Sequence, residues 1–157
     1  MTEYIANMAG EKAPGKSPHS AGEVYVSDGY IDLTVALEED DLISLCILPP
    51  KCVPLGFAIE CEDLDTGTTI TLTGGMKTRA GTDLIAAHDF FVDSDVGQAG
   101  GLQGKEWIAG NFDNLRVAYS QTEETLIALK VTAAPTGGGV GGVRGALTYR
   151  AQEQQDY

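Results

Sequence analysis

The stretch Asp41–Thr73, DLISLCILPPKCVPLGFAIECEDLDTGTTITLT, decides the fold class of this chain. It contains three apolar runs, which are separated by Pro49-Pro50-Lys51 and by Asp65-Thr66-Gly67. Strict alternation of side chains in the middle run predicts a strand with one buried face. Three adjacent strands of this kind predict a sheet whose apolar face needs a second layer to cover it. The alternating residues are Val53, Leu55, Phe57, Ile59 and Cys61 on one side and Pro54, Gly56, Ala58, Glu60 and Glu62 on the other.

The runs on either side of this stretch extend the β prediction along the chain. Residues 24–37 alternate on both sides of Asp28-Gly29, which is expected to form a turn or bulge. Gly74-Gly75 is expected to end the third run, and Phe90-Phe91-Val92 favours a strand that follows a short helix or turn. The later predicted strands are Leu115–Tyr119, Thr125–Ala133 and Val143–Ala151. Eight or nine strands with almost no helix predict an all-β chain with a jelly-roll or two-sheet β-sandwich fold.

The chain of 157 residues is expected to form one folded domain with an extended N-terminal arm. Glycine and proline break any regular element in residues 1–22, residues 23–151 carry the strand pattern, and residues 152–157 form a polar tail. The arm is expected to dock on a neighbouring subunit, with fraying as the alternative. The candidate contact residues are Tyr4, Ile5 and Met8, which would share an apolar edge on a helical turn, and the basic Lys12 and Lys16.

Charge and composition exclude several classes of partner. A net charge of −13 argues against nucleic acid or an anionic membrane surface as a direct partner. The most acidic run, Glu38–Asp41, is expected to be a solvated turn between strands. The sequence contains no run of 18 apolar residues, so no transmembrane helix is predicted. The first residues lack the pattern of a signal peptide, and synthesis in a cytoplasm is therefore expected. Cys46, Cys52 and Cys61 are expected to be core thiols.

Two segments match nucleotide-binding patterns, and neither has the necessary context. Gly10–Ser17, GEKAPGKS, matches GxxxxGK[ST], but no buried strand precedes it and Pro18 follows where a helix should begin. Gly137–Gly142 matches GxGxxG, but it leads into a predicted strand, so the helix N-terminus that holds a pyrophosphate is missing. Gly137–Gly142 is therefore expected to be a hairpin loop, and no cofactor is predicted.

Patterns that suggest metal or catalytic sites are equally incomplete. Asp65-Thr66-Gly67 is a single aspartic-protease-like triplet, whereas the chemistry needs two facing aspartates, so a tight hairpin turn is the preferred interpretation. Neither Asp63-x-Asp65 nor Asp93-x-Asp95 continues into a calcium-binding loop. The cysteines lack zinc-site spacing, and His88 lies beside phenylalanines without the pattern of a triad. No catalytic residue and no metal site are predicted.

The order of these features resembles that of the small β proteins found in the structural modules of tailed phages. The resemblance is carried by Asp41-Leu42-Ile43 leading to Leu48-Pro49-Pro50, by Val53–Phe57, and by Asp63–Gly67 leading into Ile70-Thr71-Leu72. It covers roughly Glu23 to Val92. These proteins act as head decoration, or cement, proteins.

The resemblance implies a non-enzymatic jelly roll, a dimer or trimer, that sits on the outside of a capsid. There it would bridge subunits of the major capsid protein against internal pressure. A second hypothesis is a tail or head-fibre sandwich that binds a host glycan or receptor. That hypothesis predicts an exposed aromatic cluster around Trp107, Tyr119 or Tyr149. A third hypothesis, a hydrolase or nucleotide enzyme, would require stabilisation by ATP or a metal.

Overall fold

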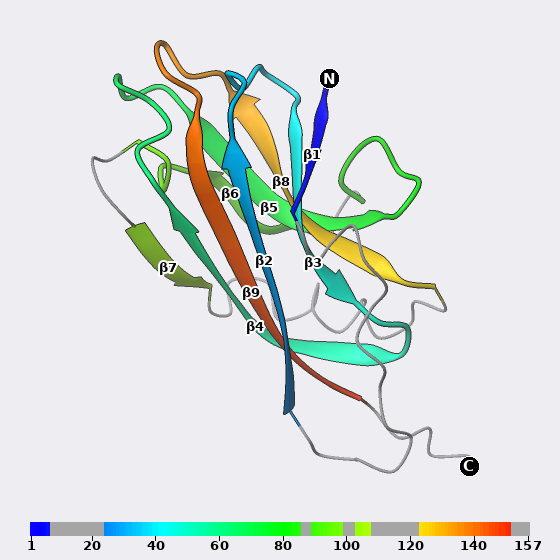
Figure 1. Cartoon of the computed structure of the whole chain (residues 1–157). Coiled ribbons are helices and arrows are strands. Elements are labelled where there is room, and N and C mark those ends of the chain that lie inside the picture. Colours follow the sequence, from blue (N-terminus) through cyan, green and yellow to red (C-terminus); the bar gives the residue numbers. More distant parts are fainter. Residues whose placement is uncertain (7–23, 86–88, 99–102, 108–122, 152–157) are drawn as a thin grey trace, which may run out of the picture.

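The computed structural model describes residues 1–6, 24–85, 89–98, 103–107 and 123–151, and these ranges contain nine strands and no helix. No described residue belongs to a helix that could cross a bilayer. The strands form two layers, which are visible in Figure 1. Their bounds are β1 (Glu3–Ile5), β2 (Val24–Leu33), β3 (Leu42–Leu48), β4 (Cys52–Cys61), β5 (Thr71–Thr78), β6 (Asp89–Ser94), β7 (Gln103–Trp107), β8 (Thr125–Ala133) and β9 (Gly141–Ala151).

Strands β2 to β9 pair in a nested order that defines a jelly roll. β2 pairs with β9, β3 with β8, β4 with β7 and β5 with β6, and each of these pairs is antiparallel. The resulting sheets have the orders β1-β3-β8-β5-β6 and β2-β9-β4-β7. This arrangement is that of a strand ribbon rolled into two facing sheets. The predicted all-β sandwich fold is confirmed.

The three strands of the opening stretch do not form one sheet, so that part of the prediction is wrong. β3 and β5 belong to the five-stranded sheet, and β4 between them belongs to the other sheet. The turn at Asp65 therefore crosses from one sheet to the other, and so do residues 134–140, which join β8 to β9; Gly141 and Gly142 of the predicted loop already belong to β9. Neither is a hairpin. Alternation shows that each strand has one buried face but does not show which sheet the strand joins.

The core lies between the two sheets, and the last strand contributes to it as predicted. Val143, Leu147 and Tyr149 are buried on one face of β9, and Gly145 lies between them. Leu55 was expected on the apolar face of its strand, but it retains 46% of its accessible surface. A shift in the pairing of β4 with β9 between Pro54 and Gly56 reverses the side-chain order there, because a bulge adds one residue to one strand.

A pair of glycines brings the two sheets into close contact. Gly29 on β2 lies opposite Gly145 on β9, and Leu45 of β3 packs against both. A Cβ atom on Gly29 would lie 1.8 Å from the carbonyl oxygen of Leu45. The expected turn or bulge at Asp28-Gly29 is wrong, since β2 pairs with β9 continuously from Val24 to Leu33. Glycine is required there by the close approach of β3.

The three cysteines are buried and none of them is in a disulfide, which confirms their prediction as core thiols. Burial raises the pKa of both Cys46 and Cys61 to about 12, because the thiolate would lose its hydration. Several predicted features lie outside the described residues: the strand at 115–119, the segment 10–17, His88 and the tail 152–157.

Candidate functional site

The N-terminal strand β1 lies at the edge of the five-stranded sheet, beside β3, as Figure 1 shows. The pairing is parallel, and it places Glu3 beside Leu42 and Ile5 beside Ser44. The amide of Leu42 donates to the carbonyl of Thr2 at 2.9 Å, and the amide of Ala6 donates to the carbonyl of Ser44 at 2.8 Å. The helical turn expected for these residues is therefore wrong, because the edge of β3 offers hydrogen-bond partners to an extended segment.

Glu3 is the residue that fastens β1 to the sheet. Its Oε1 atom accepts hydrogen bonds from Lys77 Nζ at 2.6 Å and from Ser44 Oγ at 2.7 Å. The Lys77 side chain is fully buried, with 0% exposure, whereas 31% of the Glu3 side chain is exposed. A buried ammonium group needs a carboxylate partner, since loss of hydration would otherwise be strongly unfavourable. β1 supplies that carboxylate.

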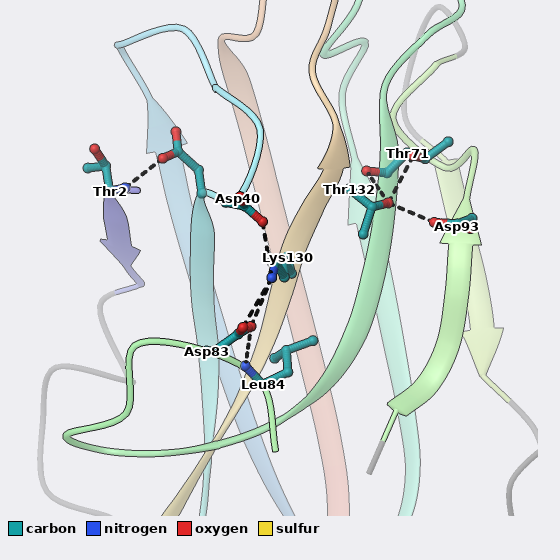
Figure 2. Close-up of polar contacts among 9 residues, drawn as sticks. Thr2, Asp40, Thr71, Asp83, Leu84, Asp93, Lys130 and Thr132 are labelled. Atoms are coloured by element: carbon teal, nitrogen blue, oxygen red, sulfur yellow. Dashed lines mark hydrogen bonds and ion pairs between the residues drawn. The ribbon is translucent and has the colours of Figure 1, made fainter. Parts of the chain in front are cut away.

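The buried carboxylate of Asp41 holds the start of the chain. Asp41 Oδ1 accepts from the amide of Thr2 at 2.6 Å, and Asp41 Oδ2 accepts from the amide of Glu38 at 2.9 Å. Figure 2 shows the contact that Thr2 makes. The expectation that the whole run Glu38–Asp41 is solvated is thus wrong at its last residue, Asp41, which is only 1% exposed.

A second polar group lies beside this site on β8. Lys130 Nζ lies 3.0 Å from Asp83 Oδ1 and 3.1 Å from Asp40 Oδ1 (Figure 2). The hydrogen bond from Lys130 lowers the pKa of Asp83, and the bonds to Asp83 and Asp40 raise the pKa of Lys130. These ion pairs connect the loop after β5 to β8 and to the turn before β3. They are partly exposed, and pairs of this kind contribute little each to stability.

A further polar contact joins β5, β6 and β8. Thr132 Oγ1 donates to Asp93 Oδ1 at 2.8 Å and lies 2.9 Å from Thr71 Oγ1 (Figure 2). Asp93 therefore has a structural partner within the sheet. Within the described ranges, no three histidine, cysteine, aspartate or glutamate side chains are placed to hold a metal ion.

The predicted arm residues are only partly described. Tyr4 is half-buried and packs against the core, and burial, followed by the charges of Asp41 and Glu38, raises its pKa. Ile5 is 51% exposed. Met8, Lys12 and Lys16 lie outside the described residues.

Sequence reasoning missed two central residues of this site, Glu3 and Lys77. The expectation that Gly74-Gly75 ends a strand is wrong, because β5 continues to Thr78 and carries Lys77 into the sheet. Phe91 occupies the space that a side chain at Gly74 would need, and this explains glycine within the strand. Met76 continues the apolar alternation of Ile70 and Leu72 beyond the glycines, and this was a signal that the strand continues.

Asp65 is engaged in structural contacts. Its two oxygens accept from three backbone amides and one hydroxyl of its own turn, at Gly67, Thr69 and Ile70. Oδ1 also accepts hydrogen bonds from Thr136 and Gly137 in the β8–β9 crossover. Burial acts to raise the pKa of Asp65, but the hydrogen bonds outweigh it and hold the pKa well below its usual range. This carboxylate ties two crossovers together.

The outer face of the four-stranded sheet carries exposed apolar side chains. Val24 and Val26 on β2 are 58% and 60% exposed, and Leu55 on β4 is exposed as well. Tyr149, which the glycan-binding hypothesis needs on the surface, is buried and stacks on Tyr25 with ring centroids 5.7 Å apart. The side chain of Trp107 and the whole of Tyr119 lie outside the described residues.

The fold defines the class of protein, a jelly roll with an added N-terminal strand. Comparison with solved structures points to phage capsids. The chain is similar to a chain in the capsid of Ralstonia phage GP4, with 28% identity and a TM-score of 0.77 over 97% of this chain and 99% of that one. It is also similar to a chain of the cyanophage Pam1 capsid asymmetric unit, with a TM-score of 0.59.

The Pam1 similarity covers 93% of this chain and 97% of that chain at 23% identity, so it shows the fold alone. No protein-family model matches the sequence, and no curated protein matches it. Both structural neighbours are chains of phage capsids, and the similarity to the chain of Ralstonia phage GP4 supports a structural role in a virion.

Proposed function

We propose that this chain is a non-enzymatic decoration protein on the outside of a phage capsid, where it bridges subunits of the major capsid protein. The observation that carries the proposal is the end-to-end similarity to a chain in the capsid of Ralstonia phage GP4, which covers 97% of this chain and 99% of that one. The resemblance of Asp41–Thr73 to phage decoration proteins supports the same role. The protein would be made in the host cytoplasm and act as a homo-oligomer in the virion.

Bridging requires two contact surfaces, and the chain offers two candidates on different sheets. The first is the N-terminal segment, which begins at the β1 edge of the five-stranded sheet. The second is the exposed apolar group on the outer face of the other sheet, made of Val24, Val26 and Leu55. Exposed apolar side chains on one face suit a protein interface. Many copies on a symmetric shell would strengthen individually weak contacts through avidity.

Reversing two charges of the arm tests the first surface. We expect Lys12→Glu combined with Lys16→Glu to weaken binding to capsids assembled without the protein by about tenfold, because these ammonium groups suit an acidic surface. Co-sedimentation with such capsids measures the affinity. A double control, Lys51→Glu with Arg150→Glu, changes the net charge equally at exposed positions of the folded domain. Equal losses in both double variants would contradict a specific role for the arm.

Making β2 more polar tests the second surface. We expect Val24→Thr with Val26→Thr to reduce capsid binding several-fold, since apolar area would no longer be removed from water on docking. The free energy of unfolding should change by less than about 0.5 kcal/mol, because both side chains are exposed. The matched control, Val35→Thr with Val92→Thr, alters equally exposed valines elsewhere. Binding that is unaffected by the β2 changes would exclude this face from the interface.

A further inference from the structure

The N-terminal strand is an addition to a fold that is complete without it. Strands β2 to β9 already form the four nested antiparallel pairs of the jelly roll. β1 adds three residues at one edge, and its pairing is parallel. The contacts of β1 thus amount to a peptide bound in a site on the rest of the domain.

That site is built from buried groups that require a particular occupant. The ammonium of Lys77 and the hydroxyl of Ser44 are both on residues with 0% exposure, and both donate to Glu3. The carboxylate of Asp41, which is also buried, accepts a hydrogen bond from the amide of Thr2. Ala6 is 1% exposed and lies beside Gly29 of β2, where the missing side chain leaves room for it. An extended segment with an acidic residue and a small apolar residue three positions later fits this site.

The chain between β1 and β2 is long enough for the strand to be delivered to another copy. Residues 7–23 are 17 residues, and a stretch from Ala6 to Val24 can reach at most about 60 Å. A folded chain of this size has a radius of gyration of only about 15 Å. A neighbouring copy's site is therefore within reach, and an exchanged strand would make the same contacts as one in its own chain.

We propose that two copies of this chain exchange their N-terminal strands, so that Glu3 of each copy pairs with Lys77 of the other. Exchange of an identical element is a low-cost route to a dimer, because every contact within the site is kept. The inference goes beyond the proposed function and does not depend on capsid binding. Its test uses the purified protein alone, so its failure would leave the proposed function unaffected.

Complementary charge reversal distinguishes exchange from pairing within one chain. Glu3→Lys alone places two ammonium groups together, and Lys77→Glu alone places two carboxylates together. Each single variant should melt about 10 °C below the wild-type protein, since a buried charge loses its partner. When the two variants are refolded together, exchange in the mixed dimer creates one native Glu3–Lys77 pair and one pair in which the two charges are reversed. The mixture should then recover the melting temperature and the dimer mass, as measured by differential scanning calorimetry and analytical ultracentrifugation.

The double variant Glu3→Lys/Lys77→Glu in one chain is the control for the reversed pair. If it is stable while the mixture stays destabilised, the strand remains in its own chain and the proposal is wrong.

A disulfide cross-link between β1 and β3 tests strand exchange even if the variants with the reversed pair do not fold. Ile5 and Ser44 are partners in the β1–β3 register, and neighbouring strands are spaced within disulfide range. Oxidation of the Ile5→Cys/Ser44→Cys variant should give a covalent dimer on a non-reducing gel. A cross-linked monomer, or an uncross-linked protein that sediments as a monomer, overturns the proposal.

Discussion

Replacing Asp65 by asparagine is expected to lower the free energy of unfolding by about 3 kcal/mol. The carboxylate accepts hydrogen bonds from both the β4–β5 and the β8–β9 crossovers, and an amide nitrogen in place of one oxygen cannot accept them. Depending on which oxygen is replaced, the new NH2 group would face either the amide of Ile70 or the amides of Thr136 and Gly137, which are hydrogen-bond donors themselves. Urea denaturation at pH 7 measures the loss.

The pH dependence of stability gives this prediction a second readout. The folded-state pKa of Asp65 lies below the unfolded value, so its contribution is complete above the unfolded pKa of about 3.9 and is lost as the pH falls from there toward the folded pKa. The asparagine variant should lack that part of the acid sensitivity. Asp63→Asn, on an exposed neighbour, is the control and should change stability by less than about 1 kcal/mol. Similar losses in both variants would mean that Asp65 has no special role.

Gly29→Ala is expected to destabilise the protein by about 3 kcal/mol or more, although it adds one methyl group. The new Cβ would lie 1.8 Å from the carbonyl oxygen of Leu45, so the two sheets would have to separate where β3 crosses β2. Thermal unfolding followed by circular dichroism measures the effect.

Gly56→Ala is the matched control for this change. A Cβ at Gly56 meets nothing within 4 Å, so we expect a change of less than about 1 kcal/mol. If the two variants were equally stable, the close approach of the sheets at Gly29 would not limit stability.

Alternation of side chains predicted which faces of the strands are buried, and it failed where that period is interrupted. β8 was predicted with its bounds, and the inward face of β9 was predicted residue by residue. The predicted burial of Leu55 was wrong because a bulge reverses which side chains face the core. The bulge depends on the pairing with the partner strand. The turn or bulge predicted at Gly29 was wrong because glycine is typical both of turns and of close contacts between strands. Only the position of β3 decides between the two.

The candidate site was harder to predict than the fold because its parts are far apart in the chain. Glu3, Ser44 and Lys77 meet only after β1, β3 and β5 are placed in one sheet. Nothing near Lys77 in the sequence marks it as buried. The apolar residues Tyr4 and Ile5 pointed to the correct segment, but the residue that fastens this segment to the sheet is the acidic Glu3.

The nested pairing also determines when the protein can fold during its synthesis. β2 lies at an edge of its sheet, and its only strand neighbour there among the described strands is β9, the last of them to leave the ribosome. Until residues 141–151 emerge, the backbone of β2 has no partner, and such edges promote aggregation. Folding is thus expected to be completed after translation and to be slow, because most strand pairs join distant residues. Chains that terminate before β9 would leave β2 unpaired and prone to aggregate.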